Sequence, residues 1–113
     1  STLYTYHISL NAAPSATPDG TNGNGVAYFQ CMRALGSGTG ENAFIRMNIY
    51  NPAGTALYKL FSWDAGHDNQ AGYWQSSSGG GSVATTSAID AVKFAVASDG
   101  ITGTFRLFGV VNS

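Results

Sequence analysis

The sequence of 113 residues has few charged side chains, one cysteine and no long apolar run. It holds five Lys and Arg against six Asp and Glu, so charged residues make up 10% of the chain and the formal net charge is −1. Binding to nucleic-acid phosphates requires clustered cations, which five dispersed ones do not supply. No apolar run reaches the roughly 18–20 residues that cross a bilayer. We therefore expect neither a nucleic-acid partner nor a membrane partner.

The residues that are abundant are apolar or small and polar. Hydrophobic residues make up 43% of the chain and aromatic residues 12%, while 45 of the 113 residues are Gly, Ser, Thr or Asn. This is enough apolar material for one core, and the length fits a single domain over residues 1–113. A surface of small polar residues suits strands and turns. It also suits packing against neighbouring subunits, because few charges have to be desolvated.

Alternation of apolar and polar residues with a period of two dominates the sequence. It predicts strands over residues 4–10, 26–35, 43–50, 55–63, 73–77, 91–97 and 101–111. Loops or turns are predicted over 12–25, 36–40, 51–54, 65–70, 78–82 and 98–100, and one helical turn over 87–90. Seven or eight short strands separated by such turns indicate an all-β fold, an antiparallel β-sandwich with jelly-roll-like topology. An immunoglobulin-like sandwich is the alternative, although this sequence lacks the cysteine pair that is usual in that fold.

The penultimate predicted strand carries Val92, Phe94 and Val96 on one face. This pattern places Phe94 in the core. Truncation of a buried phenylalanine to alanine costs about 3–5 kcal/mol, so Phe94→Ala tests the prediction.

Groups able to do chemistry are few, and each has a simpler structural explanation. His67 and Asp68 lie near Asp64 in the segment WDAGHDNQAGYW, which could bind a metal or transfer protons. Acidic and amide residues in loops more often satisfy their own backbone, so we favour turn chemistry there. The lone Cys31 excludes an intramolecular disulfide and an all-cysteine metal site, and it alternates with apolar neighbours as a small buried residue would.

Motifs for nucleophilic catalysis and phosphate binding are also missing. The sequence has no G-x-S-x-G segment, and the run Gly79–Gly81 has no following lysine as a phosphate loop would. The sequence thus predicts a protein that is not an enzyme and uses no cofactor and no metal.

Aromatic residues are the strongest candidates for a binding surface, because exposed Trp and Tyr can stack on sugars or anchor a protein interface. Adjacent residues of a strand face opposite sides, so one of Tyr73 and Trp74 should point outward. Core packing is the favoured alternative for Trp63. The predicted interface or glycan contacts are Trp63, His67, Asp68, Asn69, Tyr73 and Trp74.

Two segments resemble virion structural proteins of tailed bacteriophages. The segment NPAGTALYKLFSW over residues 51–63 resembles an "NPAGT…YK…W" hairpin of that group. The segment SAIDAVKFAVASDGITGTFRLFG over residues 87–109 is similar to an "AVDAIRF…SSGNI…GTFRLYGI" ending, with Phe108 in place of tyrosine. Together the two segments cover about a third of the chain.

The resemblance implies a non-enzymatic, often oligomeric jelly-roll-like domain on the surface of a phage particle. The leading hypothesis is a capsid decoration (cement) protein that binds the major capsid protein or other virion proteins and its own copies, for example as a trimer. The alternative is a tail-fibre or spike domain that recognises a host glycan.

Overall fold

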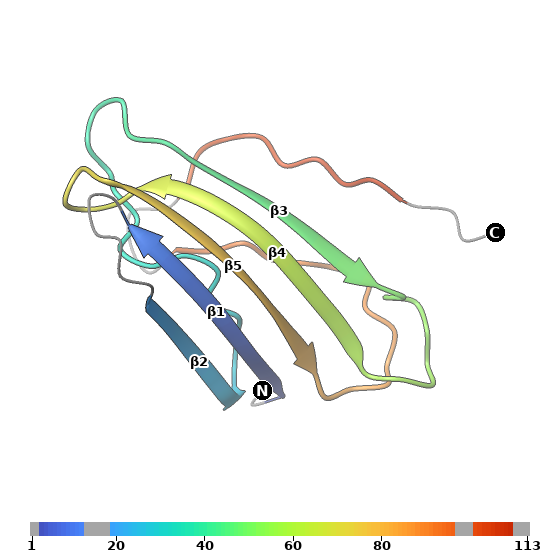
Figure 1. Cartoon of the computed structure of the whole chain (residues 1–113). Helices are drawn as coiled ribbons and strands as arrows, with labels where there is room; N and C mark the ends of the chain where they lie inside the picture. The colour runs from blue at the N-terminus through green and yellow to red at the C-terminus, as the bar shows by residue number, and fades with distance from the viewer. Residues whose placement is uncertain (1–2, 13–18, 97–100, 110–113) are drawn as a thin grey trace.

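The computed structural model describes residues 3–12, 19–96 and 101–109. Its strands are β1 (Tyr4–Ala12), β2 (Asp19–Val26), β3 (Ala43–Tyr50), β4 (Lys59–Asp68) and β5 (Trp74–Val83). They form one antiparallel sheet in the order β2-β1-β5-β4-β3 (Figure 1). The described part of the chain contains no helix. The all-β, antiparallel part of the predicted fold is confirmed.

Two strands match the alternating pattern closely. In β1, Tyr6, Ile8 and Leu10 are buried while the residues between them are exposed. In β3, Ile45 and Met47 turn toward the core with a register that pairs them with Ala65 and Trp63 of β4. The predicted turn at 51–54 is also present, because the Gly54 N–H donates to the Asn51 carbonyl at 3.1 Å. In both β1 and β3, the apolar face of the strand packs against the core.

The boundaries predicted around β4 and β5 are wrong. The predicted loop 65–70 is largely strand, because β4 continues to Asp68, and the predicted turn 78–82 lies inside β5. Gly79 and Gly81 of β5 face the core, where neighbouring side chains occupy the space of a Cβ: a Cβ on Gly79 would lie 2.9 Å from the Trp63 ring. Glycine marks a close approach here rather than a turn.

The first connection also differs from the prediction. Residues 19–25, predicted as part of the loop 12–25, form edge strand β2 together with Val26, while residues 13–18 lie outside the described residues. The predicted strand 26–35 is not formed beyond the end of β2, and Leu35 makes only an isolated bridge to Asn69. The segment 27–42 instead joins the two edge strands, β2 and β3, by crossing the core face of the sheet.

The C-terminal predictions are not confirmed either. Residues 91–96 and 101–109 form no strand, and 87–90 form no helical turn. The predicted turn 98–100 lies outside the described residues, as do residues 97, 110 and 111 of the two predicted strands. Phe94 stacks on Phe105 with ring centroids 4.8 Å apart and remains 37% exposed, so its assignment to the core is wrong. The described residues contain one sheet, and the second sheet of a sandwich is not among them.

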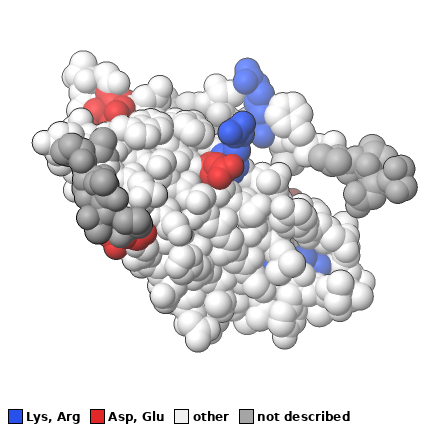
Figure 2. Space-filling view, viewed as in Figure 1, with Lys and Arg blue, Asp and Glu red and all other residues white. Residues whose placement is uncertain are grey.

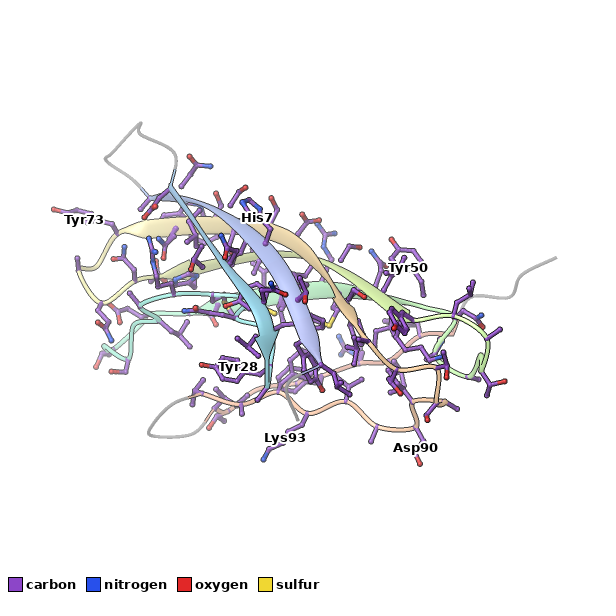
Figure 3. The ribbon with its side chains drawn as sticks, turned by 90° about the horizontal axis from the view of Figure 1, so that it is seen from below. His7, Tyr28, Tyr50, Tyr73, Asp90 and Lys93 are labelled. Carbon is purple, nitrogen blue, oxygen red and sulfur yellow. The ribbon has the colours of Figure 1, made fainter. Side chains whose placement is uncertain are left out.

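The core lies on one face of the sheet, beneath β1, β4 and β5. It is built from Tyr6, Ile8, Leu10, Phe61, Trp63 and Val83. Phe29 of the crossing segment packs into it, with its ring centroid 5.0 Å from that of Phe61. Ile89 packs against the core from the C-terminal segment, where its N–H donates to the Pro52 carbonyl. Figure 3 shows these layers: His7 lies on the outer side of the sheet, and Asp90 and Lys93 lie on the opposite side.

Candidate functional site

The outer face of the sheet carries mainly small polar side chains. Along β5 these are Ser76, Ser78, Gly80 and Ser82, which pair in register with outer-face positions of β1 and β4. Figure 2 shows few charged side chains on this side of the molecule. Because residues 76–82 of the central strand are only serine and glycine, the outer face is hollowed along this part of β5.

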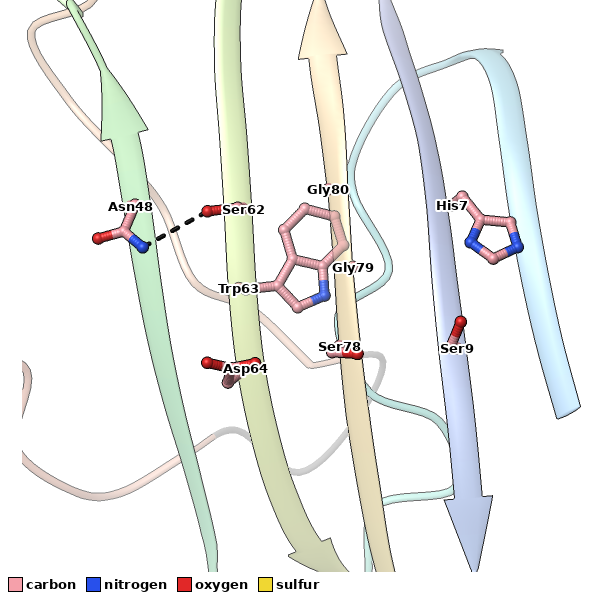
Figure 4. A pocket seen from close by; sticks show the side chains of 9 residues that line it. All are labelled: His7, Ser9, Asn48, Ser62, Trp63, Asp64, Ser78, Gly79 and Gly80. Carbon is pink, nitrogen blue, oxygen red and sulfur yellow. Dashed lines mark hydrogen bonds between the residues drawn. The ribbon is translucent and has the colours of Figure 1, made fainter. Parts of the chain in front are cut away.

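A shallow open hollow of about 460 Å³ lies over this face (Figure 4). Asn48 and Ser62, which line it from β3 and β4, approach within 3.4 Å. These groups can exchange hydrogen bonds with a polar ligand or with another protein surface. The other polar side chains that line the hollow are His7, Ser9, Asp64 and Ser78.

An aromatic pair stands at one end of the outer face. The rings of Phe44 and Trp74 stack with centroids 6.2 Å apart at 25°, and each residue is 48% exposed. We call this pair the aromatic platform. Both rings lie over Gly66, where a Cβ would come within 2.7 Å of the Phe44 ring and would also overlap Trp74. Gly66 is thus required for the platform to lie flat on the sheet.

The platform borders a small pocket of about 130 Å³ that also includes Asn42 and Asp68. The Asp68 carboxylate accepts a hydrogen bond from the Asn42 N–H at 2.9 Å, which holds the end of the crossing segment against β4. A ring face beside a carboxylate and an amide offers stacking together with hydrogen-bond acceptors and donors.

The six predicted contact residues differ in their exposure. Trp74 and Tyr73 are exposed, so they remain candidates for contact with a partner or ligand. Trp63 is a core residue with 3% of its surface exposed, as its alternative interpretation predicts. His67 is fully buried on the core face of β4, so the prediction of a surface loop residue is wrong.

Asn69 has the turn role that the sequence predicts for this segment. Its side-chain oxygen accepts hydrogen bonds from the backbone N–H groups of Ala71 and Tyr73, each at 3.0 Å. Gly72 follows with a positive φ of 80°, which closes the turn between β4 and β5. The sequence gives no sign of Phe44 as a partner of Trp74, because the two rings come together only through the pairing of β3 with β4 and of β4 with β5.

His67 and Ser77 hold the crossing segment in place. His67 Nε2 lies 2.8 Å from the Arg33 carbonyl, so this nitrogen carries the proton and donates. The Ser77 hydroxyl donates to the Cys31 carbonyl at 2.9 Å. Both side chains point to the core face, where an unpaired carbonyl would be costly. Their role in the structure is to fix 31–33 beneath the sheet.

Other groups of the described chain offer little catalytic chemistry. Burial raises the pKa of the Cys31 thiol to about 11, so the thiol is protonated at neutral pH and is a poor nucleophile. The Arg33 guanidinium pairs with Asp19 at the edge of the sheet and, with the Gly20 N–H, lowers the pKa of that carboxyl. Among the described residues no group of three His, Cys, Asp or Glu side chains is placed to hold a metal, and no helix could span a membrane.

A second exposed feature is formed by large apolar side chains of the C-terminal segment. Leu107 is 92% exposed and Phe108 79%. Val92, Phe94, Ile101 and Phe105 are also exposed, by 37% to 57%. We call residues 92–96 and 101–109 the apolar segment. Monomeric proteins rarely leave so many large apolar side chains of one short segment in contact with water.

Comparisons with known protein families, with curated proteins and with solved structures found no match to this chain.

Proposed function

We propose that this chain is a non-enzymatic structural protein of a tailed-bacteriophage particle, a capsid decoration (cement) protein that binds the shell and its own copies. The observation that carries the proposal is the apolar segment, whose large side chains are exposed on a chain with 10% charged residues. The resemblance of residues 87–109 to phage virion proteins supplies the particle as the setting.

The energetics favour association through this segment. Burying a Leu or Phe side chain contributes roughly 1.5–3 kcal/mol, and six large apolar residues of the segment are available. Lys93 and Arg106 are the only charged residues in it, so little charge has to be desolvated when it is covered. A stable interface buries about 1,000 Å² or more and uses aromatic anchors, which Phe94, Phe105 and Phe108 can supply.

The proposed fold in the assembled state is the jelly-roll-like sandwich of seven or eight strands. The sheet β1–β5 supplies five of these strands. The segments 27–42 and 84–96 cover its core face, on the side that the second layer of a sandwich would occupy.

The decisive experiment examines the particle and the purified protein together. Mass spectrometry of purified virions from a phage that encodes this chain should detect it, and cryo-microscopy should locate it on the outer surface of the shell. The purified chain should be oligomeric, a homotrimer being one expected state, and should bind capsids that lack it. A monomer without affinity for capsids would refute the proposal.

Glycan recognition by a tail-fibre or spike domain is a second candidate, favoured by the aromatic platform. The exposed faces of Phe44 and Trp74 can stack on a sugar ring, while Asn42 and Asp68 beside them can bind its hydroxyls.

A glycan array with the wild-type chain, Trp74→Ala and Tyr73→Ala tests this second function. Tyr73 is equally exposed but is not part of the pocket beside the platform, so it serves as the matched control. Binding that is lost in Trp74→Ala and kept in Tyr73→Ala supports a glycan site. The absence of binding by the wild-type chain removes the idea.

A further inference from the structure

We propose that residues 101–109 of one chain add as a strand to the open edge of β3 in a second copy. The inference rests on the proposed self-assembly and names the two surfaces that meet. In such a complex the backbone of the added strand pairs with the free edge, and alternate side chains continue the two faces of the sheet.

The two edges of the sheet differ in their suitability as templates. Edge strand β2 reads DGTNGNGV: it contains three glycines and no apolar residue before Val26, and its Asp19 is paired with Arg33. Edge strand β3 reads AFIRMNIY, with one charged residue, no proline and no glycine. Proteins protect sheet edges with charge, proline, short strands or bulges, and the described part of β3 has little of this protection.

The incoming segment has the sequence of a strand but no strand partner among the described residues. In ITGTFRLFG the residues Ile101, Phe105 and Leu107 share one parity, and Thr102, Thr104 and Arg106 share the other. Residues 101–109 form no strand, and no backbone hydrogen bond joins them to another described residue. Exposed apolar side chains therefore occur in the same nine residues as backbone groups that make no hydrogen bond to the described backbone.

The two faces of β3 match the two faces of the segment. On the core side, Ile45, Met47 and Ile49 are only partly buried, so an added strand can place Phe105 and Leu107 beside them. On the outer side, the polar Arg46 and Asn48 lie between the aromatic Phe44 and Tyr50. Polar neighbours are thus available for the threonines of the added strand and an aromatic neighbour for Phe108. Strand β3 has eight residues and the segment nine, so the ladder can run the length of the edge.

A second copy is the occupant that this arrangement favours. Within one chain the segment 101–109 and β3 are both present, yet they make no described backbone pairing and Leu107 remains almost fully exposed. Exchange of identical elements between copies is a low-cost route to a closed oligomer. A reciprocal pair or a closed ring would pair every β3 edge with residues 101–109 of another copy.

The first test measures self-association by light scattering for the wild-type chain, Leu107→Asp and Leu57→Asp. Leu107 is 92% exposed, so the change should leave the fold intact, which circular dichroism checks. Leu57 is 72% exposed in the β3–β4 connection and is the matched control. We expect Leu107→Asp to weaken association at least about tenfold and Leu57→Asp to leave it within about twofold of wild type.

The second test locates the contact by disulfide formation in a Cys31→Ser background. Chains carrying Asn48→Cys are mixed with chains carrying Thr102→Cys, Thr104→Cys or Arg106→Cys, all at outer-face positions of the expected ladder. A heterodimeric disulfide with one of the three partners is expected. A chain carrying both changes that links only within itself would overturn the exchange between copies.

The outcomes separate the inference from the proposed function. If the wild-type chain is oligomeric and Leu107→Asp associates equally well, the inference fails and self-assembly stands. If the wild-type chain is monomeric and does not bind capsids, the proposed function fails and the inference fails with it.

Discussion

Replacement of Gly79 by alanine is the sharpest test of the way the sheet is packed. A Cβ at this position would overlap the backbone carbonyl of His7 and lie 2.9 Å from the Trp63 ring. The carbonyl belongs to the neighbouring strand, so no side-chain rotation relieves the overlap and β1 and β5 must move apart. The adjacent Gly80 faces the outer side, where a Cβ would meet only the Phe61 carbonyl at 3.1 Å.

The expected magnitude follows from two opposing effects. Overpacking of a closely packed site costs about 1–3 kcal/mol or more. Replacing glycine by alanine restricts the unfolded chain, which returns about 0.4–1 kcal/mol. Because the overlap at Gly79 involves backbone, we expect Gly79→Ala to lower the free energy of unfolding by about 2 kcal/mol. For Gly80→Ala the expected change is within about 0.5 kcal/mol of zero.

Urea unfolding followed by tryptophan fluorescence measures both variants. With a slope of about 1–3 kcal/mol per M, the midpoint of Gly79→Ala should fall by about 1 M. All samples are compared at one protein concentration, so that self-association affects them in the same way. If Gly79→Ala loses no more stability than Gly80→Ala, then the Trp63 ring does not lie beneath β5 and the packing described above is wrong.

Three further experiments test other parts of the structure. Burial raises the pKa of the Cys31 thiol to about 11, so at neutral pH the thiol should react with a disulfide reagent about a hundredfold more slowly than in the urea-unfolded chain. Equal rates in the two states would contradict the burial of Cys31. Ser77→Ala removes the hydrogen bond to the Cys31 carbonyl and should lower the free energy of unfolding by about 1–2 kcal/mol. An unchanged midpoint of urea unfolding would show that this bond does not hold the crossing segment. Trp63→Ala should cost about 3–5 kcal/mol and the exposed Phe94→Ala less than about 1.5 kcal/mol, so a reversed order would refute the assignment of the core.

The conflict between local pattern and tertiary contact is clearest in β5. The sequence WQSSSGGGSV has low strand propensity, and its glycines are typical of turns. The segment nevertheless forms the central strand, because it pairs along its whole length with β1 and β4. Its small residues make room for Trp63 and for Phe29, which lies against Gly81. Propensity is a local quantity, whereas this space requirement involves residues from three other parts of the chain.

The candidate site illustrates the same limit. Exposure of at least one of Tyr73 and Trp74 could be predicted, because adjacent strand residues face opposite sides; both prove to be exposed. The burial of His67 could not be predicted, since the extension of β4 to Asp68 and the crossing of 27–42 beneath it depend on long-range pairing. The partnership of Phe44 with Trp74 spans 30 residues and depends on the β3–β4 register and on Gly66.

The sequence by itself determined the all-β class, strands β1 and β3 and the low charge of the surface, because these follow from local alternation and composition. Tertiary structure alone decided three other features: the central position of the glycine-rich strand, the burial of His67 and the exposure of Phe94, Phe105 and Leu107. The alternation in residues 91–111 shows only that these residues can form strands. Whether they do depends on a partner edge, and the backbone of an isolated segment cannot supply its own.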